Sequence, residues 1–225
     1  MSDDSSISII VPVLNEEGSL ETFFKETTNA LKGFSEWEII FIDDGSEDKS
    51  NKIIRGIADD NIQVILIQFY KNFGKSDSLS EGFKHAKGEI IITIDSDLQD
   101  DPAEIPRLIK KIQEGWDVVS GWKKDRKDPA SKRIPSKLFN LVTRMLTGIK
   151  IHDFNCGLKA YRRKVIKAVD VYGGMHRYIP AIAGKKGFSI TEIFESKSSK
   201  KDSEYFTVSI YFFKISLLRI FLIFQ

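Results

Sequence analysis

The sequence has few of the residues that build disulfide and zinc frameworks. Its 225 residues include a single cysteine, Cys156, so no disulfide can form within the chain. The three histidines, His85, His152 and His176, do not stand at the spacings of a zinc site. A chain without these cross-links depends on its hydrophobic core, and a reducing, cytosol-facing location suits it best.

The chain also has almost no net charge. Its 34 Lys and Arg residues are balanced by 32 Asp and Glu residues, which leaves a formal net charge of +2. This balance gives no global electrostatic reason to expect nucleic acid as a partner, and the basic residues lack interleaved aromatic residues that stack on bases. Because 41% of the residues are hydrophobic, the chain can bury a large core, which argues against a disordered protein.

The sequence lacks an uncharged apolar run long enough to span a bilayer. Residues 1–13 have no basic region followed by a long apolar core, so they do not indicate a secretory signal. The most apolar stretch, residues 205–225, is interrupted by Lys214 and Arg219. We interpret it as a membrane-interfacial segment or the start of a membrane anchor; a buried final helix or strand is the alternative.

Apolar runs that alternate with helical patterns dominate the first half of the chain. The expected strands cover residues 7–13, 37–43, 62–69, 89–95 and 117–121, and the expected helices cover residues 18–32, 48–58, 75–87, 102–114 and 134–148. This alternation predicts an α/β fold with a mainly parallel central sheet and helices on both faces. We expect one domain over residues 1–195, followed by a basic and then apolar tail over residues 196–225.

Polar residues follow each expected strand, and the most acidic group follows the fourth. Asp95 and Asp97 are two residues apart at the end of an extended segment, so their carboxylates leave on the same side. Two adjacent carboxylates repel unless a cation joins them, and Mg²⁺ or Mn²⁺ binds such pairs together with water and substrate phosphates. Gln99 could add a carbonyl oxygen. A solvated turn is the alternative.

The next two aspartates have a structural explanation. Asp101 precedes Pro102 and stands three residues before Glu104, which is the pattern of a helix N-cap, a first-turn proline and a capping box. We therefore expect Asp100 and Asp101 to serve the helix terminus.

Three further acidic residues and one basic segment also suit a nucleotide ligand. Glu16, Asp43 and Asp44 follow the first two strands and could accept hydrogen bonds from a base or ribose, or could cap helices. A basic loop after the fifth strand could neutralise phosphates or form a solvated surface. It contains Lys123, Lys124, Arg126, Lys127, Lys132 and Arg133.

Four segments in order resemble glycosyltransferase family 2. They are "SIIVPVLNEEGSL", "IIFIDDGSEDKS", "NFGKSDSLSEGFKHAKGEIIITIDSDLQDDPAEIP" and "HDFNCGLKAYRRKVI". Within the family, the chain is similar to the polyprenyl-phosphate group of dolichol-phosphate mannosyltransferase and undecaprenyl-phosphate glucosyltransferase. The resemblance implies a GT-A fold, a UDP- or GDP-linked sugar donor, Mg²⁺ or Mn²⁺, and a polyprenyl phosphate acceptor at the cytosolic membrane face, where cell-envelope glycans are built.

The resemblance also implies roles for individual residues. Those expected around the nucleoside are Pro12, Leu14, Glu16, Asp43 and Asp44. Those expected at the metal and diphosphate are Asp95, Asp97 and Gln99, with Lys75 near the donor. Arg133, His176 and Arg177 resemble phosphate contacts, and Asp153 matches the acceptor-side carboxylate. Asp97 and Asp153 are the expected catalytic residues in a single displacement that inverts the anomeric centre.

The tail departs from the family pattern and leaves alternatives open. The segment "SKSSKKDSEY" keeps Lys200, Lys201 and Tyr205 but has neither the arginine nor the glycine that the family commonly carries there. A family 2 transferase with a glycan acceptor and a non-catalytic nucleotide-sugar-binding module are therefore the rival interpretations. The oligomeric state, including a homo-oligomer, stays open.

Overall fold

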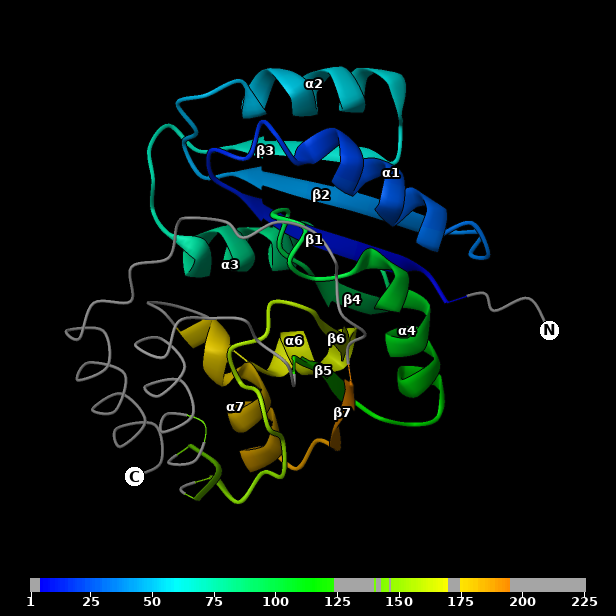
Figure 1. The fold of residues 1–225 in the computed structure, drawn as a ribbon. Helices are drawn as coiled ribbons and strands as arrows, with labels where there is room; N and C mark the ends of the chain where they lie inside the picture. Colours follow the sequence, from blue (N-terminus) through cyan, green and yellow to red (C-terminus); the bar gives the residue numbers. More distant parts are fainter. Residues whose placement is uncertain (1–4, 124–139, 141–142, 146, 170–174, 195–225) are drawn as a thin grey trace.

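The computed structural model describes residues 5–123, 140, 143–145, 147–169 and 175–194 (Figure 1). Its centre is a seven-stranded sheet with the order β3-β2-β1-β4-β6-β5-β7. The strands are β1 (Ile7–Val13), β2 (Trp37–Asp43), β3 (Val64–Gln68), β4 (Ile90–Thr93), β5 (Val118–Trp122), β6 (Lys159–Arg162) and β7 (Ile190–Phe194). Neighbouring strands are parallel except where β6 lies antiparallel between β4 and β5.

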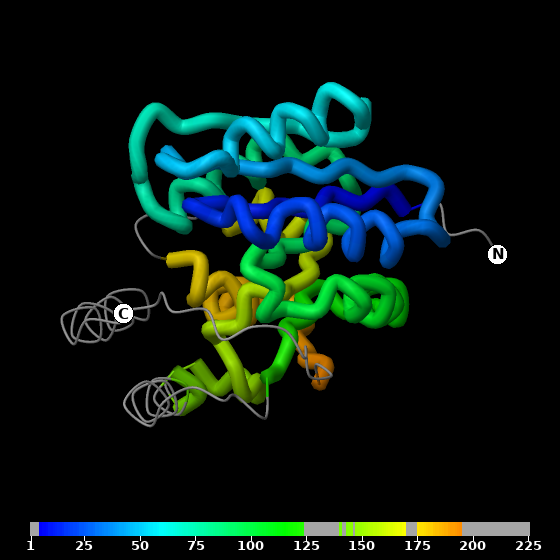
Figure 2. Tube along the Cα trace, turned by 45° about the horizontal axis from the view of Figure 1, so that its top comes forward, coloured from blue at the N-terminus to red at the C-terminus, as the bar shows by residue number. Residues whose placement is uncertain are grey.

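Helices cover both faces of this sheet. They are α1 (Leu20–Ala30), α2 (Ser50–Asp60), α3 (Lys75–His85), α4 (Ile105–Gln113), α6 (Arg163–Ala168) and α7 (Ile179–Lys185), with short 3₁₀ turns η1 (Pro102–Glu104) and η2 (Met175–Tyr178). Figure 2 shows the N-terminal elements, blue to cyan, stacked above the C-terminal ones, green to orange.

Alternation along β1 explains how the two faces are filled. Ile9 and Val11 pack in the cluster that α1, α2 and α4 contribute to, whereas Ile10 packs in the cluster that contains Leu79 of α3. Successive side chains of a strand point to opposite faces, so a strand covered on both faces is apolar at nearly every position. The largely apolar run of residues 7–13 therefore follows from its central position, and its polar residue, Ser8, is buried with its hydroxyl donating to Glu38.

The five predicted strands and the first four predicted helices are confirmed, with ends that differ by a few residues. The predicted helix over residues 134–148 lies mostly outside the described residues. The antiparallel strand β6 was not among the expected elements, because its short run is flanked by charged residues. It has a direct consequence for the site: the start of β6, and not its end, lies beside the end of β4.

None of the helices in the described parts of the chain is long and apolar enough to cross a membrane. The predicted tail over residues 196–225 lies outside the described residues, as does the basic loop beyond Lys123. The domain boundary at residue 195 and the interfacial tail stay predictions.

Gly45 lies in the loop between β2 and α2 and packs against the loop between β3 and α3. Its φ is +76°, and a Cβ atom there would lie 2.5 Å from the backbone carbon of Lys71. We expect Gly45→Ala to lower the free energy of unfolding by about 1–3 kcal/mol, because the left-handed backbone and the contact both penalise a side chain. Urea denaturation measures this. The matched control is Gly33→Ala, which meets nothing within 4 Å; an equal loss in both variants would contradict the expectation.

Candidate active site

Acidic and basic side chains gather where β1, β2, β4 and β5 end. Parallel strands bring their carboxyl ends to one edge, and ligands of open α/β sheets bind there. The antiparallel β6 adds its start to this edge, because Thr93 of β4 is the register partner of Lys159. The Thr93 hydroxyl also donates to the carbonyl oxygen of Gly157 at 2.8 Å. The segment of residues 153–159 is thereby held beside the acidic segment of residues 95–101.

Asp95 forms an ion pair with Lys75, the first residue of α3. Both side chains are about one-third exposed. Burial alone raises the pKa of Asp95, but the Lys75 ammonium outweighs it and holds that pKa below the ordinary aspartate value. The structure therefore brings together two residues that the sequence placed 20 positions apart, and keeps Asp95 ionised.

Asp97 begins a tight turn that the backbone holds under strain. Leu98 has a φ of +61°, which is uncommon for a non-glycine residue, and the Gln99 amide donates to Asp97 Oδ1 at 3.0 Å. Burial, and then the charge of Asp95, raise the pKa of Asp97. Burial raises the pKa of Glu16 too, with Asp97 and Asp95 adding to the shift. The carboxylates of Asp95, Asp97 and Glu16 thus repel one another electrostatically.

This donor set suits Mg²⁺ or Mn²⁺. Within the described residues, no three His, Cys, Asp or Glu side chains are grouped to hold a metal, so a cage built by protein alone is not seen there. Mg²⁺ takes one or two carboxylates and completes its shell with water and phosphate oxygens. Asp97, crowded by Asp95, would gain from a cation. The residues present therefore fit a metal that binds together with a diphosphate.

Asp100 belongs to the site and not to the helix terminus. Asp101 does cap η1, accepting from the Ala103 amide at 2.9 Å, so that part of the expectation is confirmed. Asp100 instead turns inward, is only 1% exposed, and forms an ion pair with Lys123. Its other carboxylate oxygen has no hydrogen-bond partner among the described residues. The sequence interpretation of Asp100 as a helix residue was wrong, because a solvent-exposed cap and a buried carboxylate look alike in the sequence.

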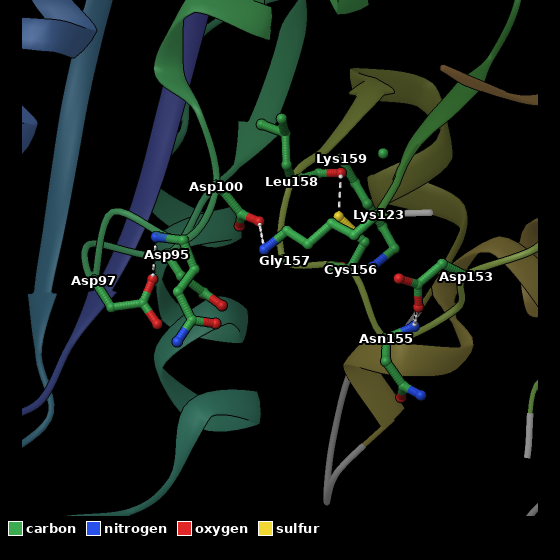
Figure 3. A network of polar contacts seen from close by, with 12 residues as sticks. Asp95, Asp97, Asp100, Lys123, Asp153, Asn155, Cys156, Gly157, Leu158 and Lys159 are labelled. Atoms are coloured by element: carbon green, nitrogen blue, oxygen red, sulfur yellow. Dashed lines mark hydrogen bonds and ion pairs between the residues drawn. The ribbon is translucent and has the colours of Figure 1, made fainter. Parts of the chain in front are cut away.

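Gly157 lies against both carboxylates. A Cβ atom on Gly157 would lie 2.5 Å from Asp95 Oδ2 and 2.7 Å from Asp100 Oδ2. Figure 3 shows Asp95 and Asp97 on one side of the Lys123–Asp100 ion pair and Asp153 on the other. Only a residue without a side chain leaves both aspartates in these positions.

Asp153 and Lys159 form the second half of the site. Asp153 is 4% exposed, and its Oδ1 accepts from the Asn155 amide at 3.0 Å. Lys159 is equally buried, and its ammonium donates to the carbonyl oxygen of Cys156. Burial lowers the pKa of Lys159, with Cys156 and Asp153 opposing that shift. Sequence reasoning assigned no role to Lys159, although it stands in the segment that carries Asp153.

The predicted nucleoside residues lie at the same edge but serve the loops there. Asp43 accepts from the Ser46 amide at 2.9 Å and from the Asn51 side chain at 2.8 Å. Asp44 accepts from the amides of Phe73 and Gly74 at 2.8 and 2.9 Å. Burial raises the pKa of Asp44, although these amides oppose the shift. Both carboxylates therefore order the edge, and their contact with a nucleoside stays a prediction.

Two other expected nucleoside contacts lie at the end of β1. Pro12 is a half-buried strand residue paired with Ile42, and Leu14, just beyond the strand, is 41% exposed. An exposed leucine beside polar loops offers an apolar surface that suits a base or ribose. Their role stays a prediction.

The predicted phosphate contacts are only partly described. His176 lies over the start of α3, with Nδ1 2.6 Å from the Ser76 hydroxyl. Burial, and then the charge of Lys75, lower the pKa of His176 well below its ordinary range. A neutral His176 could contact phosphate through a hydrogen bond but not through charge. Arg177 follows it in η2, and Arg133 lies outside the described residues.

Known proteins resemble this chain in sequence and in fold. Residues 8–170 match the family described as glycosyl transferase family 2. An undecaprenyl-phosphate 4-deoxy-4-formamido-L-arabinose transferase of Shewanella sediminis is 38% identical over 203 residues, which are 88% of this chain and 61% of the relative. The protein of that name from Pseudomonas paraeruginosa is 36% identical over 179 residues, covering 79% of this chain and 53% of the relative. The chain thus spans less than two thirds of these relatives.

Solved structures share the fold at lower identity. Glucosyl-3-phosphoglycerate synthase of Mycobacterium tuberculosis, crystallised with Mn²⁺ and UDP-glucose, is similar with a TM-score of 0.71 and 16% identity over 97% of this chain and 78% of that one. Its complex with Mn²⁺, UDP and phosphoglyceric acid has a TM-score of 0.69 and 19% identity over 88% and 72%. The predicted GT-A fold is confirmed by these neighbours. From its family match and its curated relatives together, the chain belongs to glycosyl transferase family 2.

Proposed function

We propose that this chain transfers a sugar from a nucleotide-diphosphate donor to a polyprenyl phosphate, with inversion at the anomeric carbon. The observation that supports this most strongly is the meeting of Asp95, Asp97 and the Asp153 segment at one edge of the sheet. The names of the curated relatives support the acceptor, because both transfer a sugar to undecaprenyl phosphate.

The donor would bind at the acidic half of the site, which contains Asp95, Asp97 and Gln99. Asp95, Asp97 and Gln99 would hold Mg²⁺ or Mn²⁺, and the solved neighbours that contain Mn²⁺ with UDP or UDP-glucose support this choice. A bound cation would neutralise the departing diphosphate. Lys75 keeps Asp95 ionised and would contact the same phosphates. The nucleoside would lie beside the residues at the ends of β1 and β2, which are Pro12, Leu14, Glu16, Asp43 and Asp44.

The acceptor would bind at the other half of the site, which contains Asp153 and Lys159. A lipid phosphate oxygen is anionic at neutral pH, so it needs positioning in line with the anomeric carbon more than it needs a strong base. Asp153 would orient this acceptor, and buried Lys159 offsets part of the negative charge. His176, Arg177 and Arg133 are proposed phosphate contacts. Since polyprenyl phosphate is a lipid, the reaction would take place at the cytosolic membrane face, with residues 196–225 as the membrane contact.

A donor panel tests the proposal. The full chain is incubated with Mn²⁺, short-chain polyprenyl phosphate and UDP-glucose, UDP-N-acetylglucosamine, a UDP-linked aminoarabinose derivative or GDP-mannose, and lipid-linked sugar is measured. Metal-dependent transfer from one donor is expected. Transfer to a glycan but not to the lipid would favour the glycan-acceptor enzyme. Binding of UDP or GDP with Mn²⁺ but no transfer to either acceptor would favour the binding module.

On acidification, we expect the affinity for the metal to fall at a higher pH than it would in a site made of aspartates with ordinary pKa values. Asp97 has a raised pKa, so on acidification it takes up a proton earlier, and that proton competes with the cation. For the metal-free fold the sign is opposite: the raised pKa contributes stability below the ordinary aspartate pKa, and this is lost as the pH rises through the raised value.

The increase in melting temperature on adding Mn²⁺ should therefore shrink as the pH falls, and the decline should begin above the ordinary aspartate pKa. Differential scanning fluorimetry with and without Mn²⁺ measures it. A Mn²⁺ effect that declines only at the ordinary aspartate pKa would contradict the role of Asp97 as a ligand.

A further inference from the structure

Glu192 of β7 binds the residue that precedes Asp153 through both of its carboxylate oxygens. Oε2 accepts from the backbone amide of His152 at 2.7 Å, and Oε1 pairs with Nδ1 of the same residue. The Glu192 side chain is only 16% exposed. Charged side chains are seldom this buried unless their partners are specific. Two contacts to one residue fix the backbone and the imidazole orientation together.

Aromatic packing holds one face of the same imidazole, whose edge contacts Glu192. The Trp122 ring at the end of β5 stacks on His152 with ring centroids 4.1 Å apart and an interplanar angle of 12°. Phe194 at the end of β7 packs edge-on against Trp122 at 6.1 Å. Trp122 at the end of β5 and Glu192 within β7 therefore form a clamp on His152, although His152 lies in a loop.

The clamp acts directly on Asp153, the next residue. Ser120, the register partner of Glu192 on the neighbouring strand, donates from its hydroxyl to the Asp153 carbonyl at 3.3 Å. The backbone on the N-terminal side of Asp153 is thus tied to β7, and its carbonyl to β5. Loops hold a functional side chain less well than strands do unless such supports are present.

We propose that Glu192 is a positioning residue that sets the acceptor-side carboxylate of Asp153 through His152. This inference rests on the proposed function and assigns to that site a support on the last strand of the sheet. The alternative is that the His152–Glu192 pair contributes only to the stability of the fold. The two differ in a measurable way: a positioning residue changes the use of the acceptor and leaves donor and metal binding on Asp95 and Asp97 unaltered.

Two substitutions remove the contacts of Glu192 to different extents. Glu192→Ala removes both acceptor oxygens. Glu192→Gln keeps the volume and one oxygen, and its amide can donate to Nδ1 if the imidazole changes tautomer, so it should be partly active. Glu114→Ala is the control, because Glu114 also pairs with a basic residue, Lys111, but at the exposed end of α4.

With the full chain, the KM for polyprenyl phosphate in Glu192→Ala should rise about tenfold or more, with an intermediate rise in Glu192→Gln. The KM for the donor and the Mn²⁺ affinity should change by less than about twofold. Equal changes in donor and acceptor constants, or none, would overturn the positioning role. A parent enzyme that transfers no sugar to the lipid would instead refute the proposed function.

Hydrogen–deuterium exchange provides a readout that needs no activity. In Glu192→Ala, a peptide that contains His152 at an internal position, such as residues 149–157, should exchange faster than in the parent, because the His152 amide loses its acceptor. The same peptide in Glu114→Ala should be unchanged. Unaltered exchange in Glu192→Ala would exclude the clamp whatever the substrate proves to be.

Discussion

Asp97→Asn is expected to abolish sugar transfer and to make the metal-free protein more stable. Replacing the carboxylate removes a proposed metal ligand, so transfer should fall by at least about a hundredfold, or about 2.7 kcal/mol of transition-state stabilisation. The same change removes a charge that Asp95 and burial oppose. The melting temperature without metal should therefore rise by about 1–3 °C, because relief of one like-charge contact is worth up to about 1 kcal/mol.

Radiolabelled sugar transfer and scanning fluorimetry with and without Mn²⁺ measure the two effects in one preparation. The variant should gain stability without metal and lose the stabilisation that Mn²⁺ gives the parent. Asp60→Asn, at the exposed end of α2, is the matched control and should alter neither quantity. Undiminished transfer by Asp97→Asn would remove the proposed metal site. Loss of transfer with an unchanged response to Mn²⁺ would move the metal to other ligands.

Gly157→Ala should impair the site through a single added methyl group. That carbon would lie within 2.7 Å of oxygen atoms on both Asp95 and Asp100. The backbone of Gly157 cannot easily move away, because its carbonyl oxygen accepts a hydrogen bond from the Thr93 hydroxyl and the start of β6 is paired with β4. The carboxylates must therefore move, and displacements of about 1 Å at a reacting centre can cost about a hundredfold in rate.

We expect transfer and Mn²⁺ affinity to fall together in Gly157→Ala, measured by product formation and by titration calorimetry. Gly56→Ala introduces the same methyl group within α2, where nothing lies within 4 Å. It should stabilise the protein by about 0.5–1 kcal/mol and leave activity intact. Normal metal binding by Gly157→Ala would show that Asp95 can adjust, and that the close approach has no part in the site.

The contrast between these two glycines illustrates what sequence reasoning could and could not provide. Both look like ordinary glycines in the sequence, and neither has a positive φ. What distinguishes Gly157 is its neighbours, which come from a segment about 60 positions earlier. Asp100 is a second example. Its position before a helix suggested a structural role, and only the fold shows that it is buried against Lys123.

The sequence by itself determined the α/β class, the strands and helices of the first half, the family resemblance and the D-x-D pair. These are local properties, because periodicity and the polar ends of apolar runs are readable from adjacent residues. Only the tertiary structure decided that β6 runs antiparallel between β4 and β5. That pairing brings Gly157, Lys159 and Asp153 to the acidic edge and sets Glu192 against His152. Strand order and direction depend on contacts between distant segments, and such contacts leave no periodic signal in the chain.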